Sequence, residues 1–572
     1  MLLLLAFPML KAGMTAEQRV HDFNQLAAVF AKRYAPYEWK KQVAGFDLLD
    51  TAPWLDRVRR AKDDLEFMEI CSEYVARLDD THTQYTSPGR MIADLGFYVD
   101  IYDGKVLVEQ INRARLPAAR FPFQVGDELV SLDGKTAEEW IAAFAKVRRR
   151  GSATATRRTV ADLITYRPQT VVPRVVELGD TAQVVIRRDG GELETYTVPW
   201  TKTGVPMTEI GPVPSPKAQL KAASTEAPEY LRLLSEMRNW SAPAGDHLLQ
   251  GEVWSEEAGE MVPRRYVLGI GSRAPAYGMP AGFIQRLGRI SSHFHFSGTY
   301  ESGGYKIGLL RVRSFSPSNQ AAAIAELDDE IPYMQQNTDG LVVDVMRNPG
   351  GGCYMLDVAA RLIPQPFWFF GEEHRVTLDR VNTLQAALDS AIRLRAEQWI
   401  IDTYAAILDQ MKQAYQENRG RTGPIPACTQ WGSADAPSFL NLPAKVVYTK
   451  PVIFLIDDFS ISAADIFPSM MQDNARGPLV GTRTNGAGGQ NSGPWHLMYS
   501  EAYTTCTATL VTRKAPVVTP EYPTAHYIEN VGARADIPLD YMTRENLMTG
   551  GRPFVDGFTR IIVDEIRKSR GQ

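Results

Sequence analysis

The sequence predicts a protein of the α/β class, and two segments about 110 residues apart carry most of that prediction. Each segment is a short strand rich in β-branched residues that runs into a sharp turn and then a helix. The first covers 340–352 and ends in three glycines, and the second covers 451–465. In an open α/β sheet both turns lie at the carboxyl edge of the strands, where ligands bind. Glycine amides in one turn and the hydroxyl of Ser462 in the other are the parts of an oxyanion hole and a nucleophile.

Length and composition exclude several function classes. The 572 residues suggest about three to four domains. A net charge of −5 gives no reason to expect nucleic acid or an anionic membrane as the partner. No run of about 18 apolar residues occurs, so no integral membrane span is expected. The four cysteines lie far apart without metal-type spacing, so they either pair as disulfides or stay free.

The N-terminal part is predicted to be helical from 15 to 90. Thr15 and Gln18 have the spacing of a capping box, and apolar residues follow at helical spacing. Residues 1–14 resemble the apolar region of a secretory signal without its basic start, or else form a frayed hydrophobic terminus. The first interpretation places the protein outside the cytoplasm, secreted or periplasmic.

Residues 91–203 change to a pattern of short strands with one well-signalled helix. Thr136 and Glu139 form a second capping box, and tight turns separate the strands. This β-rich unit resembles a PDZ domain, with Leu95, Gly96 and Phe97 where the carboxylate-binding loop belongs. Such a loop holds a peptide C-terminus with successive backbone N–H groups, while the peptide adds a strand to the sheet edge.

The rest of the chain divides at about residue 300. Residues 204–300 begin with a proline-rich linker and then show no clear periodicity, so they stay unassigned. Residues 301–572 have the α/β pattern, with a helical insertion at about 377–419 between the two turns. We expect this insertion either to overhang the sheet edge as a lid or to pack on its side.

Together the two turns, the strand at 306–312, the PDZ-like unit and the helical start resemble the C-terminal processing (tail-specific) serine peptidase family. The resemblance implies a crotonase-like, ClpP-like core without metal or cofactor. It implies Ser462 as the nucleophile, and an oxyanion hole from the N–H groups of Ala463 and of Gly350 or Gly351. The local alternative is that Ser462 and Asp465 are only the capping signal of an ordinary helix.

The sequence departs from the branch of this family that activates its serine with lysine. Ala487 occupies the position of that lysine, and no lysine occurs from Pro451 to Arg513, which excludes a Ser-Lys dyad there. A serine without a base is a poor nucleophile, so another base is required. The segment around His82 resembles the one that carries the catalytic histidine in the Ser-His-acid branch, which includes tricorn-type peptidases and the chlamydial protease-like activity factor. Imidazole exchanges protons near neutral pH.

The resemblance supplies the third member of a triad as Glu529, within a late Glu-Asn-x-Gly motif. A carboxylate there would fix the imidazole tautomer and stabilise the imidazolium. Other assignments remain open. His496 is an alternative base, and Asp465 or Asp536 is an alternative acid. His293 and His295 are either a metal pair or alternating strand positions. We expect Asp344 to be structural and Cys353 to pack as a small hydrophobic side chain.

The sequence therefore predicts a serine endopeptidase that acts on a protein or peptide substrate through a Ser-His-Glu triad. The oligomeric state is open between a monomer and a homodimer. The main alternative is a non-catalytic ligand- or peptide-binding protein on the same scaffold. A lipase or esterase is disfavoured because the turn at Ser462 lacks the Gly-x-Ser-x-Gly pattern.

Overall fold

A mixed sheet in the second half of the chain carries both predicted turns. The computed structural model describes residues 13–213, 227–238, 252–255, 260–263, 269–428, 439–522 and 524–571. The sheet has the order β13-β14-β15-β16-β21-β22-β27, and its strands run parallel from β15 onward. These strands are β13 (Ile284–Leu287), β14 (Phe296–Ser302), β15 (Tyr305–Arg311), β16 (Gly340–Asp344), β21 (Val452–Ile456), β22 (Leu479–Gly481) and β27 (Ile537–Pro538).

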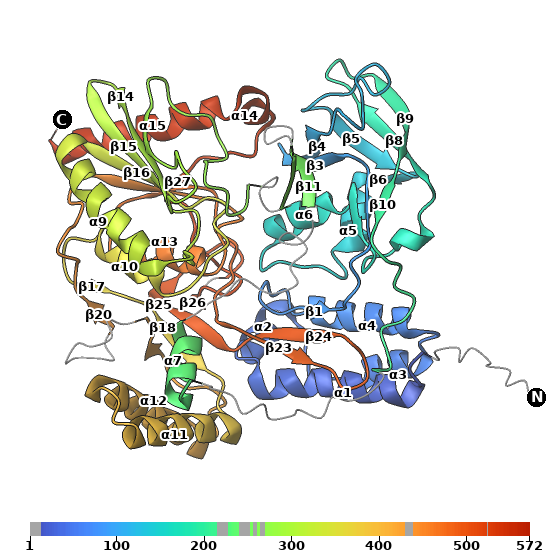
Figure 1. Ribbon diagram of the computed structural model, residues 1–572, viewed down its shortest axis with the longest axis horizontal. Helices are drawn as coiled ribbons and strands as arrows, with labels where there is room; N and C mark the ends of the chain where they lie inside the picture. The colour runs from blue at the N-terminus through green and yellow to red at the C-terminus, as the bar shows by residue number, and fades with distance from the viewer. Residues whose placement is uncertain are drawn as a thin grey trace, which may run out of the picture.

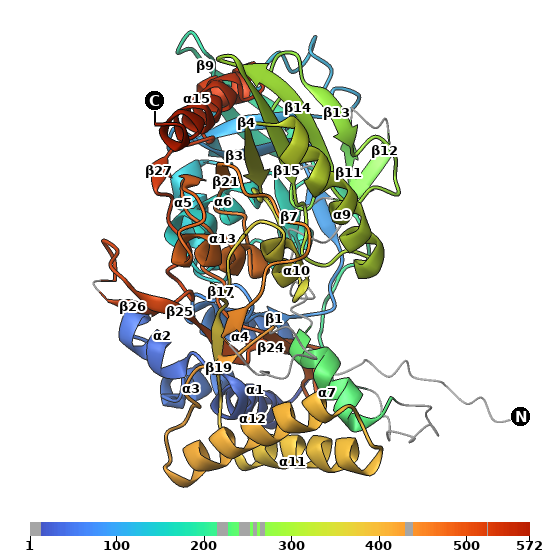
Figure 2. The ribbon, with the colours of Figure 1, turned by 90° about the vertical axis from the view of Figure 1, so that its left-hand side faces the viewer.

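Helices cover both faces of this sheet, as Figures 1 and 2 show. Successive side chains of a strand point to opposite faces. In β16, Leu341 and Val343 pack into the core cluster that contains helix residues such as Leu327 and Phe467, whereas Val342 packs with Phe558 on the other face. The helices are α9 (Gln320–Asn337), α10 (Tyr354–Ala360) and α13 (Ala463–Asp473) on the first face, with α15 (Arg552–Ser569) on the second and α14 (Arg544–Thr549) before it. The predicted α/β core is confirmed.

The PDZ-like unit is a second sheet with two helices. Its strand order is β3-β4-β5-β8-β9, with β6 paired to β5, and a smaller sheet has the order β10-β2-β7. The strands are β2 (Ile92–Asp94), β3 (Phe97–Tyr102), β4 (Lys105–Ile111), β5 (Glu128–Leu132), β6 (Lys135–Thr136), β7 (Tyr166–Pro168), β8 (Thr181–Arg187), β9 (Leu193–Pro199) and β10 (Thr201–Thr203). The helices are α5 (Ala137–Phe144), which begins at the predicted Thr136 capping box, α6 (Ala153–Asp162) and the short 3₁₀ helix η1 (Val175–Glu177).

Four helices form the N-terminal part and pack against strands from near the end of the chain. They are α1 (Ala16–Arg33), α2 (Tyr37–Ala44), α3 (Ala52–Arg60) and α4 (Asp64–Ala76). The predicted capping box of Thr15 and Gln18 is present at α1. After α4 the chain forms β1 (Tyr85–Thr86), which pairs with β24 (Tyr503–Thr507), and β24 pairs with β23 (Asn491–His496). The segment that carries His82 therefore runs directly into a sheet built from the C-terminal part.

The helical insertion packs on the side of the molecule, as one of the two alternatives predicted. It consists of α11 (Leu378–Arg393) and α12 (Gln398–Gln416), which pack on each other and on α7 (Glu229–Arg238). Arg33 bonds Asp379 of α11 at 3.0 Å, and Arg375, just before α11, bonds Glu38 at 2.7 Å, so the insertion and the segment that leads into it contact the N-terminal helices. Figure 1 shows it at the end of the molecule below the core.

Some boundaries and pairings differ from or extend the sequence analysis. The central sheet already includes β13 and the start of β14, so it begins before residue 301; β13 is half-exposed and lacks the alternation that signals a strand. Part of the unassigned region, 214–226 and most of 239–268, lies outside the described residues. Cys353 forms a disulfide with Cys428, whereas Cys71 and Cys506 are buried free thiols.

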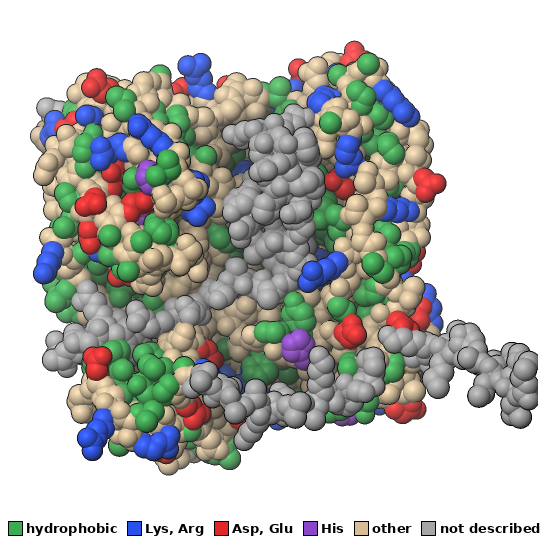
Figure 3. Space-filling model, viewed as in Figure 1, with side chains coloured by type: hydrophobic (Ala, Val, Ile, Leu, Met, Phe, Trp, Pro, Cys, Tyr) green, Lys and Arg blue, Asp and Glu red, His purple; other side chains and the backbone are tan. Residues whose placement is uncertain are grey.

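The remaining described strands are short and complete small sheets. They are β11 (Glu252–Ser255), β12 (Glu260–Pro263), β17 (Phe367–Trp368), β18 (Gly371–His374), β19 (Ile425–Pro426), β20 (Leu440–Asn441), β25 (Thr509–Val517) and β26 (Ala525–Tyr527). None of the described helices is both long enough and apolar enough to cross a membrane. On the face drawn in Figure 3, acidic and basic side chains are interspersed rather than gathered by sign.

Candidate active site

Ser462 stands in the turn between β21 and α13 with an unusual backbone. Its φ of 62° and ψ of −117° are strained for a residue with a side chain, and such strain persists where the surroundings enforce it. The side chain is fully buried, and its Oγ has no hydrogen-bond partner in the described part of the chain. The N–H of Ser462 donates to Asp465 Oδ2 at 2.8 Å. The local capping alternative therefore holds for the Asp465 carboxylate but leaves the Ser462 hydroxyl unused.

The glycine turn after β16 lies directly against Ser462. A side chain at Gly350 would place its Cβ 2.7 Å from the Cβ of Ser462 and 3.0 Å from the nitrogen of Ala463, so only glycine allows this approach. Ile461 N–H donates to the carbonyl of Asn348 at 2.9 Å, which joins the two turns. Both predicted turns thus meet at one edge of the sheet.

The backbone N–H groups of the two turns differ in whether they already donate a hydrogen bond. Gly350 N–H donates to Asn348 Oδ1 at 2.8 Å. The N–H groups of Gly351 and Ala463 donate no hydrogen bond within the described residues. Of the two predicted alternatives for the oxyanion hole, the N–H of Gly350 is therefore already bonded in this conformation and that of Gly351 is not.

Asp465 binds the backbone of the segment around Ala487, the residue at the position of the missing lysine. Its carboxylate accepts from Gly486 N–H at 2.7 Å and from Ala487 N–H at 3.0 Å, besides Ser462. Burial raises the pKa of Asp465 to about 6, and hydrogen bonds from Thr484 and these amides act against that rise. Asp465 therefore faces backbone amides, and the geometry gives it a structural role.

His82 is fully buried in the segment between α4 and β1. Its backbone N–H donates to Asp80 Oδ1 at 2.8 Å, and its carbonyl accepts from Thr505 Oγ1 at 2.8 Å. Neither ring nitrogen makes a hydrogen bond of ordinary geometry in the described part of the protein, although the backbone of Gly489 acts on the ring. Burial lowers the pKa of His82 to about 4, while Asp80 and the backbone of Gly489 act in the opposite direction. The ring is therefore neutral near pH 7, as a general base must be.

A chain of hydrogen bonds connects the segment of His82 to the turn of Ser462, about 380 residues later. Thr81 Oγ1 donates to Asn485 Oδ1 at 2.6 Å. Asn485 in turn donates its backbone N–H to the carbonyl of Ser460 at 3.0 Å and its side-chain N–H to that of Asp458 at 3.1 Å. The residue next to the predicted base is thus two hydrogen bonds away from the nucleophile turn.

Glu529 is fully buried, but its oxygens contact groups other than His82. Oε1 accepts from Lys40 Nζ at 2.5 Å, and Oε2 accepts from Gly488 N–H at 2.8 Å. Burial raises the pKa of Glu529 to about 8, and the charge of Asp80 adds to that rise. No hydrogen bond joins Glu529 to His82 among the described residues, and Asp80 is the carboxylate that acts most strongly on the imidazole.

The predicted peptide-binding loop is closed in this structure. Leu95 and Phe97 are buried in the core of the PDZ-like unit. The N–H of Leu95 donates to the carbonyl of Thr165 at 3.1 Å, and that of Gly96 donates to Asp94 Oδ1 at 2.6 Å. Two of the three loop amides are therefore already used, so a peptide carboxylate would have to displace them.

The other candidates have local partners away from Ser462. His496 is exposed on β23, and Asp536 accepts from Leu479 N–H and Gln472. Asp344 pairs with Arg311 at 2.9 Å and accepts from Met346 N–H, which is a structural role. His293 accepts from Gly288 N–H and His295 bonds Glu326 and Tyr354. No group of residues suited to hold a metal occurs among the described residues.

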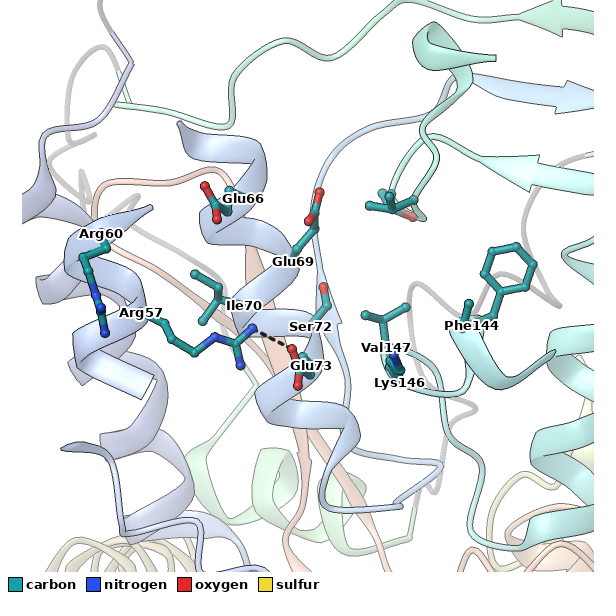
Figure 4. A pocket seen from close by; sticks show the side chains of 13 residues that line it. Arg57, Arg60, Glu66, Glu69, Ile70, Ser72, Glu73, Phe144, Lys146 and Val147 are labelled. Atoms are coloured by element: carbon teal, nitrogen blue, oxygen red, sulfur yellow. Dashed lines mark hydrogen bonds and ion pairs between the residues drawn. The ribbon is translucent and has the colours of Figure 1, made fainter. Parts of the chain in front are cut away.

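A surface cavity of about 440 Å³ lies elsewhere, between the N-terminal helices and the PDZ-like unit. Figure 4 shows Glu66, Glu69 and Lys146 on its walls and the ion pair of Arg57 with Glu73, 2.7 Å long. Neither Ser462 nor His82 lines it. Because both of those residues are fully buried, a polypeptide reaches Ser462 only after a rearrangement of the surrounding chain.

Comparison with known proteins identifies the two main parts. Residues 306–514 match peptidase family S41, and residues 91–207 match the PDZ domain. A protein of Chlamydia pneumoniae is 23% identical over 97% of this chain and 91% of its own length, and one of Chlamydia trachomatis serovar D is 23% identical over 98% and 96%. Solved structures of mature CPAF, free and in complex with lactacystin, are 19% identical with TM-scores of 0.74 and 0.72. They cover 97% of this chain and 98% and 99% of their own, which shows a shared fold.

Proposed function

Because this chain carries a peptidase family S41 domain and is a serine peptidase, we propose that it cleaves peptide bonds with Ser462 as nucleophile and His82 as general base. The observation that carries this proposal is the buried, strained Ser462, which lies against the glycine turn and whose hydroxyl has no hydrogen-bond partner among the described residues. A protein or peptide is the substrate, as for any peptidase.

The reaction follows the general course of acyl transfer. Ser462 Oγ attacks the scissile carbonyl carbon while His82 takes the hydroxyl proton. The negative charge on the carbonyl oxygen is held by the N–H groups of Ala463 and Gly351, which have no other partner among the described residues. His82 then gives its proton to the leaving amine as the C–N bond breaks. Water, deprotonated by His82, hydrolyses the acyl-enzyme.

The acid of the proposed triad is Glu529, whose ionised form stabilises the imidazolium. Burial raises the pKa of Glu529 to about 8, and Lys40 acts against that rise. Support comes from the buried cluster that Glu529 shares with Asp80, two residues before His82. Gly488, which donates to Glu529, is next to Gly489, whose backbone acts on His82. A direct bond between Glu529 and the imidazole requires a change from the conformation described above.

The PDZ-like unit is proposed to capture a substrate C-terminus. Its helix α6 reaches the nucleophile turn, because Thr154 Oγ1 donates to Asp458 Oδ1 at 2.9 Å. Binding at the loop of Leu95, Gly96 and Phe97 requires that its amides leave their present partners.

Labelling by a serine-directed fluorophosphonate tests the proposal. We expect a single adduct on Ser462 in the parent protein, located by peptide mass spectrometry, and no adduct in Ser462→Ala or His82→Ala. His496→Ala is the matched control, because His496 is exposed on β23 and should label like the parent.

Because Ser462 is buried, the labelling reaction should be followed for hours. It should be run both without urea and with urea at a concentration below the unfolding transition. A folded parent that acquires no adduct under either condition overturns the proposal and leaves a non-catalytic binding protein on the same scaffold. An adduct that persists in His82→Ala overturns the assignment of the base alone.

A further inference from the structure

Lys40 is a fully buried lysine with all of its donors used. It belongs to α2, and its side chain is 1% exposed. Nζ donates to the carbonyl of Asp79 at 2.8 Å, to Asn530 Oδ1 at 2.8 Å and to Glu529 Oε1 at 2.5 Å. An ammonium has three N–H donors and no acceptor, so this set of three acceptors fits the charged form.

The three acceptors belong to the two segments that carry the proposed base and acid. Asp79 precedes His82 by three residues, and Asn530 follows Glu529. Asn530 Nδ2 donates back to the carbonyl of Asp79 at 2.9 Å and to that of Gly151 at 3.1 Å. Lys40 and Asn530 thus join segments that are about 450 residues apart in the chain.

The charge of Lys40 also favours the ionised forms of a buried cluster of three carboxyl groups, those of Asp79, Asp80 and Glu529. Burial raises the pKa of Glu529 to about 8 and raises that of Asp79, and in both cases Lys40 acts against the rise. Burial would raise the pKa of Asp80 as well, but Lys40 leads the groups that bring it below its usual value. Other titratable or charged groups that act on the cluster are His82, Tyr34, Arg149, Arg150, Arg483, Cys506 and Tyr522.

We propose that Lys40 is a positioning residue of the peptidase site, whose ammonium favours the ionised form of Glu529 and holds the segment of His82 against the segment of Glu529. It acts through these groups and has no hydrogen bond to Ser462. Lys40 lies outside the parts of the chain that match peptidase family S41 and the PDZ domain. The inference rests on the proposed function, because it assigns Glu529 a role in the reaction.

The test compares Lys40→Met, Lys40→Arg and the matched control Lys41→Met in peptide cleavage from pH 5 to 9. Lys41 is the next residue of α2, but it is half-exposed and pairs with Asp47. We expect Lys40→Met to lower kcat on the order of 10- to 100-fold with little change in KM. Without the ammonium Glu529 ionises at higher pH, so the acidic limb of kcat should move up by about one pH unit. Lys40→Arg should restore part of both effects, and Lys41→Met should match the parent.

A double-mutant cycle with Glu529→Gln separates this role from simple structural support. If part of the effect of Lys40 passes through Glu529, Lys40→Met should lower kcat by a smaller factor in the Glu529→Gln background than in the parent. The double variant also removes both members of the buried ion pair, so it remains informative if Lys40→Met alone does not fold. An equal loss in both backgrounds, or a Lys40→Met enzyme with the parent's pH profile, overturns the inference. A parent that neither cleaves peptide nor forms the Ser462 adduct overturns the proposed function instead.

Discussion

Different kinds of bond hold the two sides of the candidate site. We call the turn of Ser462 the nucleophile side, and the segments of His82 and Glu529 the base side. On the nucleophile side, Asp465 accepts from the backbone amides of Ser462, Gly486 and Ala487, all within about 25 residues of it. On the base side, the ammonium of Lys40 bonds groups 39, 489 and 490 residues away. The first arrangement depends on local chain geometry, and the second depends on charge that is buried only when distant segments meet.

The largest effect should come from removing either the nucleophile or its base. Ser462→Ala and His82→Ala should each lower kcat/KM by about 10⁴-fold or more, because the hydroxyl and its base act as a unit. For the same reason the double variant should be no slower than the worse single variant. Steady-state cleavage of a peptide library, with thermal unfolding to confirm the fold, checks this. If the losses in kcat/KM of the two single variants multiplied in the double variant, the two sides would act independently.

Asp465→Asn tests the nucleophile side alone. The amide side chain can accept from some of the three N–H groups, but its own N–H₂ must face at least one of them. We expect a loss of about 3 kcal/mol in the free energy of unfolding and a fall in kcat on the order of 100-fold, since Ser462 loses its backbone anchor. Urea unfolding and cleavage assays measure both. Asp536→Asn is the control, because Asp536 caps Leu479 outside the site; equal effects would remove the special role of Asp465.

The base side should show its burial as a dependence of stability on pH. The folded pKa of His82, about 4, lies below its unfolded value near 6.5, so the folded state binds fewer protons between these values. Stability from this group is present above pH 6.5 and is lost as pH falls toward 4. Between pH 8 and pH 5, the free energy of unfolding should therefore fall by about 2 kcal/mol less in His82→Gln than in the parent. Urea titrations at the two pH values measure this, with His496→Gln as the exposed control; parallel losses would contradict the burial of His82.

The smallest effect concerns the bond that joins the two sides. Thr81→Val removes the donor to Asn485 Oδ1 and leaves a buried acceptor without its partner. We expect a cost of about 1 kcal/mol in the free energy of unfolding, and Thr81→Ser should recover most of it. Chemical unfolding and kcat should be measured for both variants. If Thr81→Ser is as damaged as Thr81→Val, the methyl group rather than the hydroxyl supports the contact.

The sequence predicted the parts of the site whose geometry is local. A β-branched strand followed by glycines, or by a serine at a helix start, is readable because a few adjacent residues decide the turn. The same holds for the capping boxes at Thr15 and Thr136, whose bonds span three residues. The peptidase domain and the PDZ domain were predicted for this reason, and the comparisons confirm both.

Other features had no local signal. Lys40 stands in a short amphipathic helix where a lysine usually faces solvent, and nothing near it in the sequence points to Glu529 or Asp79. The half-exposed β13 escaped assignment to the sheet because it lacks alternation. The pairing of Cys353 with Cys428 and the bond that occupies the N–H of Gly350 also depended on distances that the sequence does not contain.

By itself, the sequence determined that a serine and a row of glycine amides meet at the edge of an α/β sheet, because strand, turn and helix signals are set by neighbouring residues. The tertiary structure alone decided how the base side is held, and that Glu529 bonds Lys40 and Gly488 in this conformation. The reason is physical: a buried ion pair is stable only where distant segments exclude water and supply every remaining hydrogen bond.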